Sequence, residues 1–158
     1  KEHEMNLSAN FTLKELTKSD TATRLGLDNT PGEAEIENLR LLCEKVLQPV
    51  RDHFGKSVTV NSGYRSPESN AAVNGSKSSD HCKGMAADIE IAGVANADLA
   101  QWIMDNLDYT QLILEFYTQG IPDSGWVHVS YDPNNLKNQE LTAVKVAGKT
   151  QYLNGLHA

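Results

Sequence analysis

Residues 79–91 read SDHCKGMAADIEI, and they show how this chain builds a central strand with a polar face. From residue 86 to residue 91 the side chains alternate, which predicts a strand with Asp88 on one face and Ile89 on the core face. His81 comes before this strand, with six residues between it and Asp88. Gly84 gives the intervening chain the freedom to fold the imidazole back toward the carboxylate. The stretch therefore predicts a loop histidine and a strand aspartate that meet at one site.

A second histidine has a similar setting later in the chain. In residues 126–130 the alternation places Val127 and Val129 on the core face of a strand, so His128 points into a polar site. His81, Asp88 and His128 together offer two imidazole nitrogens and one carboxylate oxygen. Catalytic zinc sites use such a set of three and leave a fourth position open. These residues are the candidate metal ligands, and Zn²⁺ is the expected cofactor.

Three further residues could support hydrolysis at such a site. Glu115 ends the apolar strand predicted over residues 111–116, where a lone carboxylate is costly unless it is paired or functional. Burial there would raise its pKa toward that of a general base. Arg65, in the turn after a strand predicted over residues 57–61, could offer its planar guanidinium to a substrate carbonyl or carboxylate. Asp132 follows the His128 strand and could orient a ligand.

The order of predicted elements indicates the fold class. The 158 residues, 39% hydrophobic and 22% charged, are typical of one globular domain. Periodicity and turn signals predict helices over 12–16, 21–25, 36–54, 66–73 and 95–107, and strands over 57–61, 85–91, 111–116, 126–131 and 141–146. Because no βαβ rhythm is sustained, we expect an α+β domain spanning residues 1–158, with a small, mainly antiparallel sheet flanked by helices. Residues 134–158 are a weakly specified C-terminal segment.

Charge and hydropathy limit the partners. The net charge of −7 and the absence of any Lys/Arg run argue against nucleic acid or an anionic membrane as a partner. No apolar stretch approaches the roughly 20 residues that span a bilayer. The first ten residues have no secretory signal pattern, so we expect the protein to be cytoplasmic as synthesised. We also expect a monomer. We expect Met5 to be the native start and residues 1–4 to be a cloning remnant.

Three motifs together resemble a known family. SGYRS at 62–66, SxHxxGxAxD at 79–88 and WxH at 126–128, in this order, are similar to the zinc D-Ala-D-Ala peptidases that cut peptidoglycan stem peptides. That family includes carboxypeptidases, vancomycin-resistance dipeptidases and phage endolysins that cleave L-Ala-D-Glu bonds, and it shares its fold with the Hedgehog signalling domain. The resemblance spans about residues 8–133. It implies that His81, Asp88 and His128 hold zinc and that Arg65 contacts a stem-peptide substrate near the scissile bond. Ser79 belongs to the same motif and would support the ligands.

One departure from the family pattern bears on catalysis. Many relatives carry the catalytic acid three residues before the last histidine, and this position is Gly125 here. Phage-associated members resemble this chain in having a glutamate at the end of the preceding strand, which matches Glu115. The absence of a secretory signal suits a phage or prophage lysis enzyme that acts at the bacterial cell wall, with a virion-borne tail component as the alternative. Asp123 and Glu90 are weaker candidates for the base.

Two alternative functions follow from the same residues. If no carboxylate serves as the base, the chain is a catalytically inactive zinc-binding interaction domain, as the Hedgehog likeness permits. Non-haem iron oxygenases also use two histidines and one carboxylate. Their usual H-x-D pair has one intervening residue, so the longer spacing between His81 and Asp88 argues against them.

Overall fold

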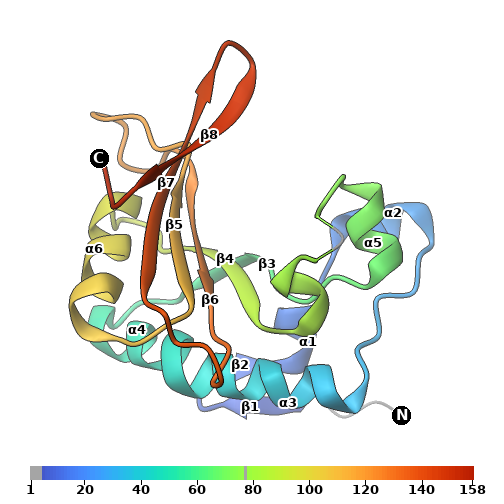
Figure 1. Cartoon of the computed structure of the whole chain (residues 1–158). Coiled ribbons are helices and arrows are strands. Elements are labelled where there is room, and N and C mark those ends of the chain that lie inside the picture. The colour runs from blue at the N-terminus through green and yellow to red at the C-terminus, as the bar shows by residue number, and fades with distance from the viewer. Residues whose placement is uncertain (1–4, 77) are drawn as a thin grey trace.

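A six-stranded mixed sheet forms the centre of the molecule, and the long helices pack against one of its faces (Figure 1). The computed structural model describes residues 5–76 and 78–158, so the expected remnant at residues 1–4 lies outside the described residues. The strands are β1 (Asn6–Ser8), β2 (Phe11–Thr12), β3 (Thr59–Ser62), β4 (Ala86–Glu90), β5 (Gln111–Glu115), β6 (Trp126–Ser130), β7 (Gln139–Val146) and β8 (Lys149–Asn154). The helical segments are α1 (Leu13–Thr17), α2 (Asp20–Leu25), α3 (Glu33–Leu42), η1 (Cys43–Leu47), α4 (Gln48–Phe54), α5 (Pro67–Ala72), η2 (Asp80–Lys83) and α6 (Asn96–Asn106).

The strand order in the large sheet is β3-β4-β6-β5-β7-β8. Neighbouring strands are antiparallel throughout this sheet, except that β5 and β7 are parallel. The structure confirms the α+β fold with a mainly antiparallel sheet. Its register places Asp88 of β4 directly opposite His128 of β6, and Ile113 of β5 opposite His128 from the other side. Directly opposed residues point to the same face of a sheet, so Asp88 and His128 share one face.

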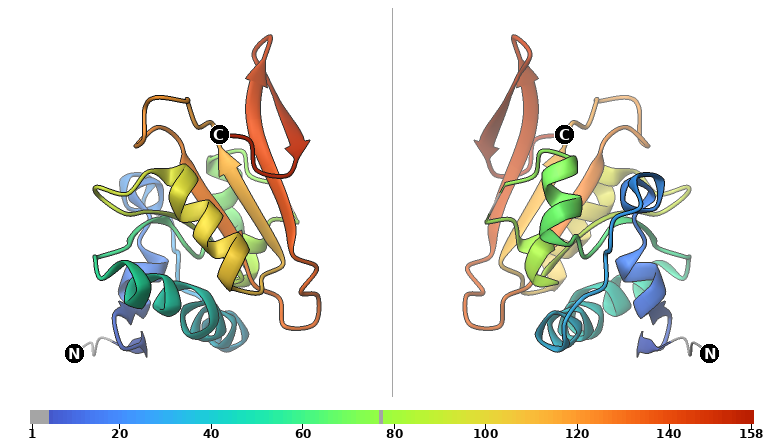
Figure 2. Two further views of the ribbon diagram at one scale, coloured as in Figure 1. Left: turned by 90° about the vertical axis from the view of Figure 1, so that its left-hand side faces the viewer. Right: turned by 90° about the vertical axis from the view of Figure 1, so that its right-hand side faces the viewer.

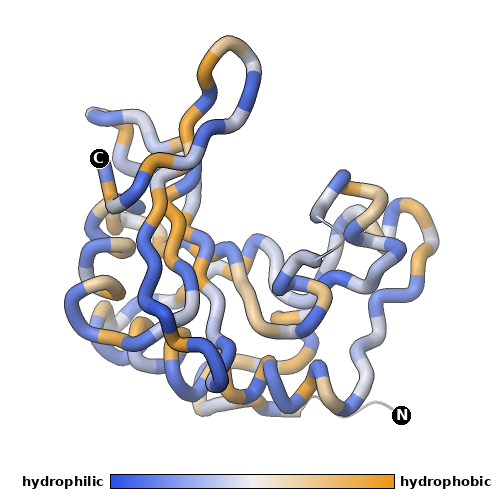
Figure 3. The backbone as a smooth tube through the Cα atoms, in the orientation of Figure 1, coloured by the Kyte–Doolittle hydropathy of each residue, from blue (hydrophilic) through white to orange (hydrophobic). Residues whose placement is uncertain are grey.

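Alternate residues of the central strands form the core beneath the long helices. Ala87 and Ile89 of β4 and Val127 and Val129 of β6 are fully buried in one apolar cluster with side chains of α3, η1, α4 and α6. Burying a side chain such as valine or isoleucine contributes about 1.5–3 kcal/mol. Figure 3 shows the apolar segments gathered along these central strands. The predicted alternation is confirmed, and it leaves the opposite face of β4 and β6 to polar side chains.

The helix predicted over residues 36–54 is interrupted by one wider turn. The chain is helical from Glu33 to Phe54, but Cys43–Leu47 forms a π-helical segment in which the Gln48 N–H donates to the Cys43 carbonyl. Pro49 gives the physical reason, because it has no N–H and its ring would clash with the carbonyl four residues earlier in a regular α-helix. Gly55, with a φ of 64°, ends the helix and donates its N–H to the Arg51 carbonyl. None of the described helices is long and apolar enough to cross a membrane.

The C-terminal segment adds a hairpin that the sequence does not fully predict. The strand predicted over residues 141–146 lies within β7, but β8 follows it, and all of β8 pairs with residues 141–146 of β7. Ala147 and Gly148 connect the two strands with φ angles of 54° and 79°, which is the backbone geometry of a tight two-residue hairpin turn. The tip of this hairpin stands clear of the rest of the molecule (Figure 2). Because every residue of β8 is exposed, its sequence has no alternation of apolar side chains to indicate a strand.

Candidate metal centre

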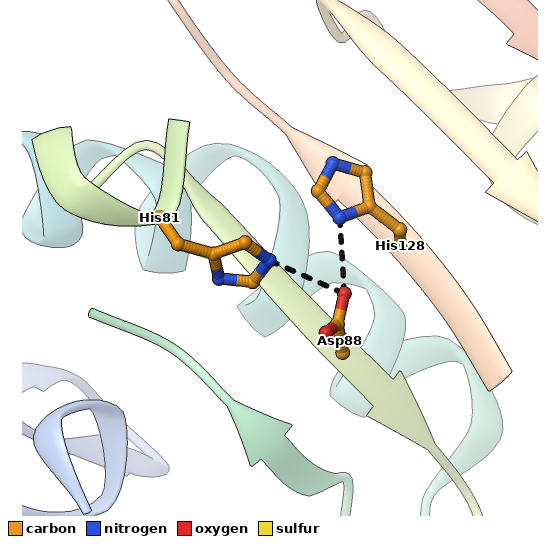
Figure 4. Close-up of side chains that lie close together, drawn as sticks. All are labelled: His81, Asp88 and His128. Carbon is orange, nitrogen blue, oxygen red and sulfur yellow. Dashed lines mark hydrogen bonds and ion pairs between the residues drawn. The ribbon is translucent and has the colours of Figure 1, made fainter. Parts of the chain in front are cut away.

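Three side chains from separate parts of the chain meet above the polar face of the sheet. Asp88 Oδ1 lies 3.0 Å from His128 Nδ1 and 3.4 Å from His81 Nε2 (Figure 4). One potential ligand atom from each residue lies within 4.8 Å of the others, so the three could hold a metal ion. The structure thus brings together the residues that the sequence analysis selects as metal ligands.

The two strand residues owe their positions to the sheet register. Asp88 and His128 are direct cross-strand partners in the antiparallel β4–β6 pair, where facing Cβ atoms lie about 4.5–5.5 Å apart. The buried neighbours Ile89 and Val127 hold this register, because a slip of one residue would turn them out of the core. Both ligand positions are therefore fixed by rigid backbone.

His81 is positioned by a short helical turn rather than by an open loop. The Ser79 hydroxyl accepts a hydrogen bond from the His81 N–H at 3.2 Å at the start of η2. Gly84 ends η2 with a φ of 73°, and a Cβ atom there would lie 2.5 Å from the Glu35 carbonyl oxygen of α3. The glycine is therefore required for close packing of η2 on α3 as well as for the turn.

A backbone carbonyl sets the tautomer of His81. The Gly63 carbonyl oxygen lies 2.7 Å from His81 Nδ1. Because a carbonyl oxygen can only accept, Nδ1 carries the proton, so in the neutral imidazole Nε2 has the lone pair that a metal ion would bind. Metal-binding histidines are commonly oriented by such a bond. The sequence analysis missed Gly63 in this role, because a backbone acceptor leaves no side-chain signal.

The electrostatics of the three residues favour a charged carboxylate. Burial alone would raise the pKa of Asp88, but hydrogen bonds and charge from His128 and His81 outweigh burial and lower it well below its usual range. For His128, burial lowers the pKa, whereas the hydrogen bond and charge of Asp88 raise it to a greater extent. A buried carboxylate that stays ionised beside two imidazoles is the donor set of catalytic zinc centres. The residues present therefore fit a zinc ion.

Glu115 lies on the same face of the sheet, next to these ligands. It ends β5 opposite Trp126, and it shares a face with Ile113, the direct partner of His128. Burial raises the pKa of Glu115, while the nearby His128 opposes this shift. The Trp126 indole also lowers this pKa, although Trp126 Nε1 makes no hydrogen bond of normal geometry among the described residues. Glu115 is thus a partly desolvated carboxylate beside the candidate ligands, as its place in an apolar strand predicts.

The remaining predicted site residues occupy different environments. Arg65 lies beside His81, whose carbonyl accepts the Arg65 N–H at 3.1 Å, and the buried Arg65 Nε has no hydrogen-bond partner among the described residues. The Asp132 carboxylate instead accepts the Asn134 N–H at 3.0 Å in a local turn. Arg65 therefore presents an unsatisfied donor, whereas the described contacts of the Asp132 carboxylate are local.

A cavity of about 410 Å³ joins these groups. It is lined by Arg65, Ser76, Ser78, Ser79, Asp80, His81, Asp88, Gln111, Ile113, Glu115, Trp126, His128 and Tyr152. Gln111, Ile113 and Glu115 are alternate residues of one strand and so share a face, which means that Gln111 and Ile113 could have been expected there. Tyr152 could not, because it reaches the cavity from β8. The weaker base candidates Glu90 and Asp123 line a different cavity.

The backbone at Gly125 leaves no room for a side chain. It has a φ of 63°, and a Cβ atom there would lie 1.9 Å from the Glu115 carbonyl oxygen. No side chain fits in this tight turn without moving the end of β5. The backbone of Glu115 thus occupies the space that a carboxylate at position 125 would need.

We expect Gly125→Ala to lower the free energy of unfolding by about 3 kcal/mol, because backbone strain and overpacking each cost about 1–3 kcal/mol. Gly55→Ala is the matched control, since Gly55 has a similar φ of 64° with nothing within 4 Å of an added Cβ. We expect that control to lose only about 1 kcal/mol from the backbone conformation. Urea denaturation of both variants measures the difference. Equal losses would show that the contact with Glu115 carries no cost.

Comparison with known proteins places the chain in a family. A comparison with curated proteins finds no significant match. A family model described as Peptidase M15 matches residues 9–130, which include Arg65, Glu115 and the three candidate metal ligands. The matched segment ends with the last residue of β6 and covers well over half of the 158 residues. The chain therefore belongs to the M15 family of peptidases.

Proposed function

We propose that this chain is a zinc metallopeptidase that hydrolyses amide bonds in the stem peptides of peptidoglycan. The observation that carries the proposal is the single cavity that holds the His81–Asp88–His128 cluster, a desolvated glutamate and an arginine with an unsatisfied donor. Membership of a peptidase family supports amide hydrolysis as the reaction. The resemblance of the SxHxxGxAxD and WxH motifs to peptidoglycan peptidases supports the substrate class.

His81, Asp88 and His128 are the proposed zinc ligands. When bound, a zinc ion supplies Lewis-acid chemistry that activates water and polarises an amide carbonyl. The protein orients its ligands from the backbone, since Gly63 holds the His81 imidazole and the β4–β6 register holds the other two side chains. Three protein ligands leave room for water and substrate, which is the arrangement of catalytic rather than structural zinc sites.

Glu115 is the proposed general base. Its carboxylate takes one proton from the attacking water and then gives that proton to the nitrogen of the leaving amine as the amide C–N bond breaks. Glu115 gains one proton in the first transfer and loses it in the second, so the enzyme returns to its starting protonation state. Burial raises the pKa of Glu115, which makes the carboxylate a stronger base than an exposed glutamate.

Arg65 is the proposed substrate-binding cation. Arg65 lines the same cavity as the candidate ligands, so its guanidinium can meet a substrate oxygen there. The guanidinium can hold a carbonyl or carboxylate oxygen near the scissile bond and stabilise negative charge that develops there. We propose that the protein does this at the bacterial cell wall.

The first test is to incubate the purified protein with zinc and a set of defined muropeptides. The set contains peptides that end in D-Ala-D-Ala and peptides that contain an L-Ala-D-Glu bond. Mass spectrometry identifies which bond is cut, and we expect cleavage of at least one of them. Cleavage of unrelated peptides but of no stem peptide would contradict the proposed substrate class.

A further inference from the structure

The C-terminal hairpin extends the active sheet beyond the part of the chain that matches the family. The family match ends at residue 130, and β7 and β8 both lie after it. β7 pairs in parallel with β5 along the whole of β5, from Gln111 opposite Gln139 to Glu115 opposite Ala143. The hairpin is therefore attached to the strand that ends with Glu115. Side chains of β8 that line the cavity therefore lie outside the segment that matches the family.

One row of side chains runs across four strands from the candidate site to the hairpin. Trp126 opposes Glu115, Glu115 opposes Ala143, and Ala143 opposes Tyr152. These four residues share a face of the sheet, because direct partners point the same way. Since adjacent strands lie about 4.8 Å apart, the backbone of Tyr152 is about 10 Å from that of Glu115. The small side chain of Ala143 lies between them and is fully buried.

Tyr152 forms part of the wall of the cavity. It lines the cavity together with Glu115 and His128, although it is 57% exposed. Burial and the negative charge of Glu115 both raise the pKa of the Tyr152 phenol. The phenol is therefore close enough to the Glu115 carboxylate to interact with its charge. A partly exposed tyrosine offers a large, rigid surface and a polar tip at a low cost in side-chain entropy.

The sheet order sets the direction of a bound chain. Arg65 follows β3 at one edge of the sheet, whereas Tyr152 lies on β8 at the other edge. The candidate metal ligands lie on β4, on β6 and on η2 near Arg65, and Glu115 lies on β5. A peptide that contacts Arg65 and places an amide over the ligands therefore crosses the strands, and its other end runs toward Tyr152.

We propose that Tyr152 is a specificity-determining residue that contacts the substrate peptide on the side of the scissile bond opposite to Arg65. This inference rests on the proposed function, in which a stem peptide occupies the cavity. The phenol ring packs against the peptide beyond the cut amide, in the cavity that Tyr152 and Glu115 both line. The C-terminal hairpin, outside the family-matched segment, thus sets which peptides the protein prefers.

The test compares the zinc-loaded parent with Tyr152→Ala, Tyr152→Phe and Leu153→Ala on one defined stem peptide. Leu153 is the matched control, because it is the next residue of β8, is 39% exposed and points to the opposite face. For Tyr152→Ala we expect KM to rise about tenfold, the effect of losing one good contact, with kcat changed less than about threefold. Tyr152→Phe keeps the ring and stays within about threefold of the parent, and Leu153→Ala behaves as the parent does.

A binding measurement separates this inference from the proposed function. The dissociation constant of the same peptide is measured by calorimetry with Glu115→Gln and with the Glu115→Gln, Tyr152→Ala double variant. If the parent cuts the peptide but Tyr152→Ala changes neither KM nor the dissociation constant, the inference is wrong and the proposed function stands. If the parent binds the peptide without cutting it, the proposed function fails, and a weaker dissociation constant for Tyr152→Ala still supports the inference. A parent that neither binds nor cuts overturns both.

Peptide length gives a second readout that a merely structural role would not change. The effect of Tyr152→Ala should disappear when the stem peptide is shortened on one side of the scissile bond and persist when it is shortened on the other. A loss of equal size on every peptide would contradict a local contact. Such a result would indicate that the substitution disturbs Glu115 or the hairpin as a whole.

Discussion

Glu115→Gln is expected to lower kcat by about 10²–10⁴-fold, the usual contribution of a positioned general base. Glutamine has the shape of glutamate but cannot accept the proton of the attacking water. The fold and the metal centre should persist, because the candidate ligand set consists of His81, Asp88 and His128 and does not include Glu115. Zinc content and KM should therefore stay close to those of the parent. Steady-state kinetics with a stem peptide, together with metal analysis, measure these quantities.

The matched control for this prediction is Glu90→Gln. It makes the same chemical change at a carboxylate that lines a different cavity and accepts a hydrogen bond from Asn61 Nδ2 at 2.7 Å. We expect this variant to keep the activity of the parent. Asp80 provides a second comparison, because it lines the same cavity as Glu115. Undiminished cutting by Glu115→Gln would rule out the assigned base, and a large loss in Asp80→Asn alone would move that role to Asp80.

His128→Ala is expected to abolish both zinc binding and hydrolysis. Loss of a residue that only orients a ligand already costs about 10–100-fold in metal affinity, so loss of a ligand should exceed about 100-fold. Zinc should also stabilise the parent, by about 2.7 kcal/mol when the metal is present at one hundred times its dissociation constant. That stabilisation should vanish in the variant. Zinc titration and thermal unfolding with and without zinc measure both effects.

His53→Ala is the control for the loss of a histidine as such. His53 is exposed at the end of α4 and stacks on Trp102, with ring centroids 4.4 Å apart. We expect this variant to bind zinc with the affinity of the parent. Equal zinc affinity in His128→Ala and the parent would contradict the assignment of the metal ligands and leave Asp88 and His128 as a hydrogen-bonded pair of structural importance only.

Local sequence patterns were sufficient where burial imposes a strict alternation. Val127 and Val129 had to face the core, so the direction of His128 followed from the sequence, and Ile89 gave the direction of Asp88 in the same way. The helices predicted over 12–16 and 66–73 also begin at local signals: Thr12 and Glu15 form a capping box, and the Ser66 side chain caps α5, so each signal joins residues three positions apart.

Contacts between distant segments were beyond the reach of the sequence. The parallel pairing of β5 with β7 joins two strands that another strand separates along the chain, and no local pattern specifies such a partner. The Gly63 carbonyl that orients His81 is a backbone group, so it has no residue signature. Tyr152 lies in an exposed strand. Neither face of that strand is buried, so its sequence has no need for the alternation of apolar and polar residues that indicates strands elsewhere. The Asp132 carboxylate accepts a hydrogen bond within its own turn, and its role in orienting a metal ligand stays a prediction.

The most direct test of the central claim is cleavage of a defined muropeptide by metal-free protein to which zinc is added stepwise. We predict no products from the metal-free protein, and activity that rises in proportion to bound zinc and levels off at one ion per chain. The two product masses should sum to that of the substrate plus one water. An intact muropeptide in the presence of fully zinc-loaded protein would contradict the account and leave a zinc-binding domain without peptidase activity.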